Sequence, residues 1–179
     1  TMVVPHGKGL AMQESAGGVK IKRFRYFWPS SLETLALGHG IPENLKANPL
    51  KYALVPFFLL FFSLKVLFEA RGKDIIHANW LPAGIAALPA KYLLGKPVVV
   101  TVHGADVRGI NKGILGFFMK RFDAVTTGHE ELLAIAKELV PEKAFLVRNA
   151  MDFAALENRP GKTRAKKNLG LAGKKVVSF

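Results

Sequence analysis

The sequence contains no cysteine, which excludes disulfides, thiol catalysis and metal sites ligated by cysteine. Motifs of several enzyme classes are missing as well. There is no Walker loop, and Gly7-Lys8-Gly9 followed by Met12 breaks the dinucleotide-binding pattern Gly-x-Gly-x-x-Gly. Neither the Gly-x-Ser-x-Gly motif of α/β-hydrolases nor an Asp-x-Asp pair for a metal-bound diphosphate is present. The five histidines have no zinc-ligand spacing, so no metal and no other cofactor is expected.

Acidic residues are scarce. The chain has 13 of them against 26 Lys and Arg, for a net charge of +13. This excess favours anionic partners, namely phosphorylated substrates, an acidic membrane surface or nucleic acid. Basic residues follow no recognisable nucleic-acid motif, so no specific nucleic-acid partner is expected. After Glu157 the charged residues are all basic, in a tail that equally suits a solvated linker: Arg159, Lys162, Arg164, Lys166, Lys167, Lys174 and Lys175.

Short apolar runs alternate with longer helical patterns. This order predicts an α/β protein with a doubly wound, Rossmann-like parallel sheet. In such sheets ligands bind outside the carboxyl ends of the strands. Pro89 is expected to kink or split its helix, and Gly95 to end it. We expect strands over 19–26, 74–77, 97–103, 124–127 and 144–147, and helices over 83–94, 114–122 and 130–140.

Residues 52–68 form the most apolar segment. A helix of this length spans about 26 Å, the lower edge of what crosses a bilayer. Lys65 within the segment and Pro56 near its start count against a membrane span. A core helix is the first expectation, and a helix lying in the membrane interface is the second. Either role would use the face that carries Phe57, Phe58, Phe61, Leu64 and Phe68.

His103 follows the strongest strand pattern, PVVVTVH, and precedes Gly104. A histidine at the carboxyl end of a buried parallel strand lies where ligands bind. Its imidazole can donate a hydrogen bond to a sugar hydroxyl or stabilise the charge of a departing phosphate. Gly104 would permit a sharp turn or the close approach of a ligand. On its own, a histidine at a strand end is more often structural.

Four segments in order resemble one known family: HANWLPAG (77–84), KPVVVTVHGADV (96–107), FDAVTTGHEEL (122–132) and VRNAMDFAAL (147–156). Together they resemble the N-terminal domain of retaining glycosyltransferases of family 4, which have the GT-B fold. In that fold two Rossmann-like domains face each other across a cleft. The resemblance implies that the N-terminal domain holds the acceptor and that the other holds most of the nucleotide sugar.

The resemblance also implies a division of the chain. Residues 1–156 would be the acceptor-side domain, without its first strand and glycine-rich loop. Residues 157–179 would be a basic linker and the start of a donor-side domain. The pair of glutamates seven residues apart that marks the family's donor-side domain has no counterpart here.

Site residues follow from the same resemblance. His103 matches the histidine that reaches the donor sugar and is the expected catalytic residue. Gly104, Asp106, Asn79 and Asn149 are the expected substrate-binding residues, with Asp106 organising its loop. Asn79 stands where many relatives have a second histidine.

Two further departures from the family pattern affect turns. Ala150 replaces the usual glycine of the Asn-Gly-Val-Asp motif to which Asn149 and Asp152 belong. Gly128-His129 replaces a serine, which removes a side-chain cap from the following helix.

The expected function is therefore retaining glycosyl transfer of the hexosyltransferase type, from a nucleotide sugar to a sugar or lipid-linked acceptor, or to a polysaccharide precursor. The nucleotide sugar is a co-substrate, and the chain alone is expected to be inactive. We expect a cytoplasmic protein, with peripheral contact at the inner face of the membrane through residues 52–68. The alternative is a nonenzymatic basic module that binds nucleic acid or an anionic surface.

Overall fold

The computed structural model describes residues 1–38, 40–104, 107, 110–148, 150, 157 and 159–176. The chain divides into two compact units, Thr1–Arg148 and Asn149–Phe179. This division falls a few residues before the predicted boundary at 156/157. The assignment of the two parts to acceptor-side and donor-side domains stays a prediction.

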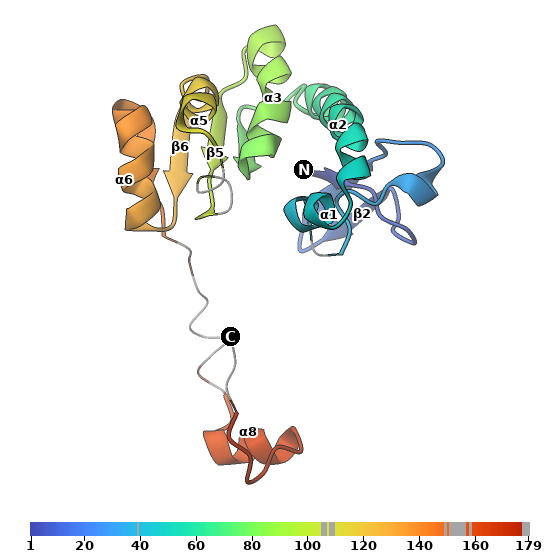
Figure 1. Cartoon of the computed structure of the whole chain (residues 1–179), viewed down its shortest axis with the longest axis vertical. Coiled ribbons are helices and arrows are strands. Elements are labelled where there is room, and N and C mark those ends of the chain that lie inside the picture. The colour runs from blue at the N-terminus through green and yellow to red at the C-terminus, as the bar shows by residue number, and fades with distance from the viewer. Residues whose placement is uncertain are drawn as a thin grey trace. The chain divides into compact units, whose positions relative to one another are not determined.

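A four-stranded parallel sheet forms the centre of the first unit, with strand order β4-β5-β6-β7 (Figure 1). The predicted α/β class with a parallel sheet is therefore confirmed. The strand predicted over 74–77 lies two residues later, so that Asn79 belongs to the strand and pairs with Thr101. The strands are β4 (Ile76–Asn79), β5 (Val98–Thr101), β6 (Ala124–Thr127) and β7 (Ala144–Leu146).

Three helices pack on this sheet: α3 (Leu81–Leu94), α5 (Lys112–Met119) and α6 (Glu130–Leu139). Gly95 ends α3 in the left-handed conformation, as predicted. Pro89 lies inside α3 and does not split it, so the second of the two expected outcomes is wrong, and the expected kink stays a prediction. The neighbours Leu88 and Ala90 are buried, and this packing holds the helix together despite the missing backbone donor.

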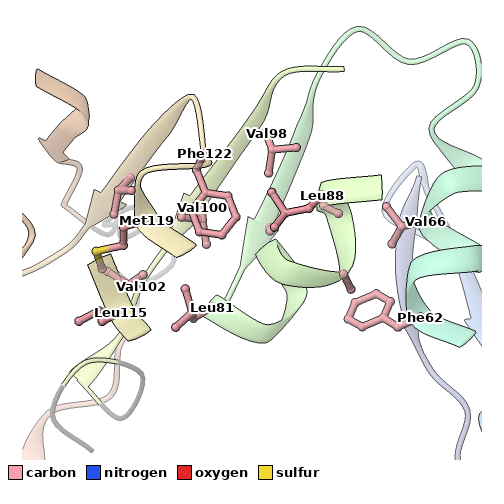
Figure 2. Close-up of a cluster of buried hydrophobic side chains, with 14 of the residues drawn as sticks. Phe62, Val66, Leu81, Leu88, Val98, Val100, Val102, Leu115, Met119 and Phe122 are labelled. Atoms are coloured by element: carbon pink, nitrogen blue, oxygen red, sulfur yellow. The ribbon is translucent and has the colours of Figure 1, made fainter. Parts of the chain in front are cut away.

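The core of the first unit lies between the sheet and α3 (Figure 2). Val98, Val100 and Val102 alternate along β5 and its extension, and all three are fully buried. Gly84 of α3 approaches so closely that a Cβ there would lie 2.9 Å from Phe122 Cζ. Helix α3 is in turn packed against α2.

A second sheet, of three strands in the order β1-β3-β2, lies at the N-terminal side of the unit. Strands β1 (Met2–Pro5) and β3 (Val19–Phe24) are parallel, and β2 (Gln13–Ala16) pairs antiparallel with β3. The predicted strand at 19–26 is thus confirmed, two residues shorter than expected. Helix α2 (Val55–Glu69) covers this sheet through Phe58 and Phe62, which pack against Phe24.

The segment between β3 and α2 is anchored by a buried carboxylate. Glu33 accepts a hydrogen bond from the backbone N–H of Tyr26 at 2.7 Å and contacts Nδ1 of His6 at 2.6 Å. The Tyr26 hydroxyl accepts from the N–H of Leu35. Buried polar groups must be paired in this way to offset their lost hydration. Helical elements of this segment are a 3₁₀ turn (Ser30–Leu32), α1 (Ile41–Ala47) and a 3₁₀ helix (Pro49–Leu54) that leads into α2.

The second unit contains one described helix, α8 (Lys162–Asn168). The described residues around it are mostly exposed, and the charged ones from Arg159 on are all basic. In the first unit, a short 3₁₀ helix (Pro141–Lys143) connects α6 to β7. Residues 177–179, in the expected start of the donor-side domain, lie outside the described residues.

Candidate functional site

Two polar side chains meet at the carboxyl ends of β4 and β5. Nε2 of His103 lies 2.9 Å from Oδ1 of Asn79. Because an amide oxygen only accepts, the ring N–H at Nε2 is the donor in this bond. Both side chains are exposed. The pair therefore combines a fixed imidazole with access to solvent, at the sheet edge where α/β proteins bind ligands.

Backbone pairing beyond the strands holds this pair in register. The N–H of Trp80 donates to the carbonyl of Thr101, and the N–H of Val102 donates to the carbonyl of Thr126, each at 2.9 Å. Sheet-like backbone hydrogen bonds thus continue next to Asn79 and His103, and they fix the backbone that carries both side chains.

Trp80 has a backbone conformation that side chains rarely adopt. Its φ is 118° and its ψ is 141°, and it is the one non-glycine residue with positive φ among those the structure describes. Such a conformation costs on the order of 1–3 kcal/mol and persists where surrounding contacts enforce it. The strained residue directly follows Asn79 and begins α3, so the sharp change in direction occurs next to the His103–Asn79 pair.

A row of hydrogen-bonded side chains continues from the pair across the same face of the sheet. Nε2 of His77 lies 2.7 Å from Oγ1 of Thr101, which lies 2.7 Å from Oγ1 of Thr126. His77 and Asn79 are two residues apart on β4, so they point to the same face, as do Thr101 and His103. We call His77, Asn79, Thr101, His103 and Thr126 the polar row.

The opposite, amino end of the sheet carries a structural carboxylate. Oδ2 of Asp123 accepts from the N–H of Val98 at 2.8 Å and pairs with Nζ of Lys91 at 2.7 Å. Burial raises the pKa of Asp123, but its hydrogen bonds with Lys91 and Val98 and the charges of Lys91 and Lys143 outweigh this effect. The pKa therefore lies below its ordinary value. This carboxylate ties β5 to the loop before β6 and lies away from the His103–Asn79 pair.

The structure brings two of the five predicted site residues into contact, His103 and Asn79. Gly104 follows directly, and its φ is outside the left-handed region. A Cβ at Gly104 would meet no atom within 4 Å, so its proposed part in a turn or in the close approach of a ligand stays a prediction. Asp106 and Asn149 lie outside the described residues, as does Asp152 of the same motif.

Sequence reasoning missed three members of the polar row: His77, Thr101 and Thr126. The available signal was the alternation of side chains along a strand: His77 lies two residues before Asn79, and Thr101 lies two residues before His103. Thr126 lies on the neighbouring strand β6, where it pairs with Thr101. His129 is confirmed as a helix start without a side-chain cap.

The arrangement places hydrogen-bonding side chains at the carboxyl ends of β4 and β5. The imidazole and amide of the pair, and the hydroxyls behind them, can donate to and accept from the hydroxyl groups of a sugar. Among the residues described, no three His, Asp or Glu side chains gather as metal ligands. The expectation of a metal-independent site stays a prediction.

Comparisons with known proteins show a family through one match and a fold through another. The sequence profile described as Glycosyltransferase Family 4 matches residues 3–154. A solved structure of a sucrose-phosphate synthase from Thermosynechococcus elongatus is similar with a TM-score of 0.52 and 15% identity, over 85% of this chain and 76% of that one. At this identity the likeness shows the fold, which is GT-B. No curated protein gives a significant match.

Proposed function

Because this chain belongs to glycosyltransferase family 4, we propose that it is the acceptor-side domain of an enzyme that moves a hexosyl group from a nucleotide sugar to an acceptor. The observation that carries the proposal is the His103–Asn79 pair. It lies at the carboxyl ends of adjacent parallel strands and is exposed to solvent.

His103 has a defined part in the proposed reaction. Its imidazole hydrogen-bonds the donor sugar near the reacting carbon, while Asn79 holds the ring at Nε2. Transfer proceeds with retention of anomeric configuration. As the bond to the leaving diphosphate breaks, positive charge builds up on the sugar and negative charge on the phosphate. Fixed donors and a basic cleft stabilise that separation of charge.

The described residues supply one wall of such a cleft. Two surface hollows, one lined by β2 and β3 and the other by residues 157–168, contain neither His103 nor Asn79. In a GT-B enzyme the groups that bind the nucleotide belong to a second domain. We therefore infer that these 179 residues do not turn over alone. Asp106 and Asn149 are proposed to contact the substrate as well.

The acceptor is proposed to be a sugar or a lipid-linked sugar, with transfer on the cytoplasmic side of the membrane. Support comes from the net charge of +13, which suits phosphorylated substrates and an acidic inner membrane face. No metal or other cofactor is proposed to take part.

The test is sugar transfer by the protein at its natural length. It is incubated with a panel of nucleoside diphosphate sugars and with sugar and lipid-linked acceptors, and product anomers are identified by NMR. The expected result is transfer with retention, insensitive to a chelator. An inverted product would contradict the mechanism. No transfer from any donor, together with sequence-dependent nucleic-acid binding at moderate salt, would favour the basic binding module instead.

Asn79 can be tested as a positioning residue through the pH profile. Asn79→Asp places a carboxylate beside the imidazole, which favours the charged form of the ring. The midpoint of the pH profile of kcat/KM should therefore move to higher pH. Asn79→Leu, which removes the bond without adding charge, should lower turnover without that displacement. A profile that is identical in both variants would mean that Asn79 does not act through His103.

A further inference from the structure

Helix α2 is apolar on both its buried and its exposed side, with Ser63, Lys65 and Glu69 as its polar residues, which is unusual for a helix at the surface of a domain. One side is accounted for by the core. Phe58, Phe62 and Val66 are buried, and the ring centroids of Phe62 and Phe24 lie 4.7 Å apart. Helix α2 therefore packs in the core on this side, but the predicted face was wrong for that role, because only Phe58 of its five residues is buried.

The other side carries a continuous apolar surface without cover among the residues described. Each member has another three or four residues away along the helix, so the members share one side of it. Single exposed apolar residues are ordinary, but a contiguous row of large ones marks an interaction surface. This exposed stripe consists of Phe57 (45% exposed), Leu60 (53%), Phe61 (41%), Leu64 (52%) and Phe68 (61%).

The helix is long and apolar enough to cross a bilayer, counting Pro49–Glu69 with a mean hydropathy of 1.8. Its buried contacts oppose that arrangement. Besides the aromatic packing, Glu69 pairs with Lys22 of β3 at 2.7 Å and with Lys65 at 3.0 Å. Burial raises the pKa of Glu69, but the hydrogen bonds and charges of Lys22 and Lys65 more than offset this, so the pKa is lowered. The carboxylate is therefore kept ionised, and α2 stays attached to the domain while its outer face is exposed.

Charges at the end of the stripe indicate the nature of the partner. The guanidinium of Arg71 lies 5.6 Å from the centre of the Phe68 ring, and Nζ of Lys65 lies 6.0 Å from it. Lys73 follows and is exposed. An apolar surface bordered by cations complements a layer of hydrocarbon beneath anionic headgroups.

Aromatic residues with a polar group lie near the other end. Phe27 packs edge-on against Phe57, with ring centroids 5.3 Å apart. Its neighbour Trp28 is 84% exposed, and Tyr52, just before α2, is 61% exposed. Trp and Tyr prefer the boundary between headgroups and acyl chains.

We propose that the exposed stripe of α2 lies in the interface of a membrane that contains anionic lipids, with the helix parallel to its surface. The occupant of this surface is thus a lipid bilayer rather than another protein. The inference rests on the stripe and its bordering cations, and not on the transfer reaction proposed above. A protein bound in this way would act on substrates at the same surface.

The test is co-flotation of the protein with vesicles at low salt, using phosphatidylcholine alone and phosphatidylcholine mixed with phosphatidylglycerol. The stripe variant is Leu60→Gln with Leu64→Gln, two exposed positions in which glutamine keeps helix propensity. The matched control is Leu93→Gln with Ile114→Gln, two positions that are at least as exposed but lie on α3 and α5. Circular dichroism and thermal unfolding verify that both variants fold.

We expect the wild type and the control to float with the anionic vesicles, and the stripe variant to bind at least about tenfold more weakly. Arg71→Gln and Lys73→Gln should each weaken binding roughly fivefold, the equivalent of about 1 kcal/mol per charge. Failure of the wild type to bind would overturn the proposal. Equal binding by the stripe variant would overturn it too, since the basic tail at 159–175 would then suffice. Dimers of the wild type that the stripe variant abolishes, without vesicle binding, would assign the stripe to a second copy of the chain.

Discussion

The two faces of the β4–β7 sheet differ sharply in chemistry. On one face Val98, Val100 and Val102 are fully buried beneath α3 and α5. The other face carries the polar row, in which His77, Asn79 and His103 are exposed. Parallel sheets are commonly covered on both faces. In the part of the chain that the structure describes, one face thus forms the core, and the other carries the site that we propose for binding.

This contrast makes separable predictions. Substitutions on the buried face should change stability, and they should reduce activity only because part of the protein unfolds. Substitutions on the polar row should change activity at nearly constant stability.

The largest effect is expected from Phe122→Ala. Phe122 is fully buried and packs next to Gly84 and Val100. Removing the ring leaves a cavity, so the free energy of unfolding should fall by about 3–5 kcal/mol. Denaturant titration measures this loss. Phe117→Ala, at a half-exposed position of α5, is the matched control and should cost about 1 kcal/mol or less. Equal losses in the two variants would contradict the assignment of the core.

One substitution can be made on each side of the comparison. In Gly84→Ala the new Cβ would lie 2.9 Å from Phe122 Cζ and 3.0 Å from Val100 Cγ2, so overpacking should destabilise the fold by about 1–3 kcal/mol. In Gly104→Ala the Cβ meets open space, and stability should change by about 0.5 kcal/mol or less.

The two glycine variants should rank in the opposite order when kcat/KM of the folded protein is compared, with Gly104→Ala more impaired than Gly84→Ala. If the donor sugar approaches Gly104 closely, the methyl group of Gly104→Ala lowers kcat/KM although the protein remains fully folded. A variant with unchanged stability and unchanged kcat/KM would remove Gly104 from the site.

The smallest effect concerns the amino end of the sheet. Asp123 has a lowered pKa, so it binds its proton more weakly in the folded state than in the unfolded state, where the ordinary value is 3.8. Its contribution to stability is present above that value and is lost as the pH falls through and below it. Asp123→Asn should therefore flatten the acid limb of the stability profile. The effect should be small, because the side chain is 44% exposed and solvent screens the Lys91 pair. Acid titration of thermal stability in both proteins checks this, and parallel profiles would refute it.

Strong local patterns allowed much of this fold to be predicted. The valines of 97–103 gave the central strand, and β6 has the predicted bounds, 124–127. Strand β2 was not predicted, because Gln13–Ala16 is exposed throughout and has no apolar alternation. It forms because Gly17 and Gly18, both with positive φ, turn the chain back to pair with β3. Local hydrophobicity carries no signal for such a strand.

The site was predicted in part for a similar reason. His103 could be placed from its strand, but its contact with Asn79 depends on the register between β4 and β5. Register is set by long-range packing, which the sequence pattern does not show. Because β4 lies two residues later than the predicted strand, Asn79 is at the end of the strand and not in the loop after it. The hydroxyls of Thr101 and Thr126 join the row for the same reason.

The most direct test of the account is the turnover of His103→Ala in the protein at its natural length. We expect kcat to fall by at least about tenfold, which corresponds to roughly 1.4 kcal/mol of barrier, while the melting temperature stays unchanged. His77→Ala alters the same polar row two residues before the carboxyl end of β4 and should reduce kcat clearly less. A His103→Ala enzyme with wild-type turnover would contradict the assignment of this face as the site of sugar transfer.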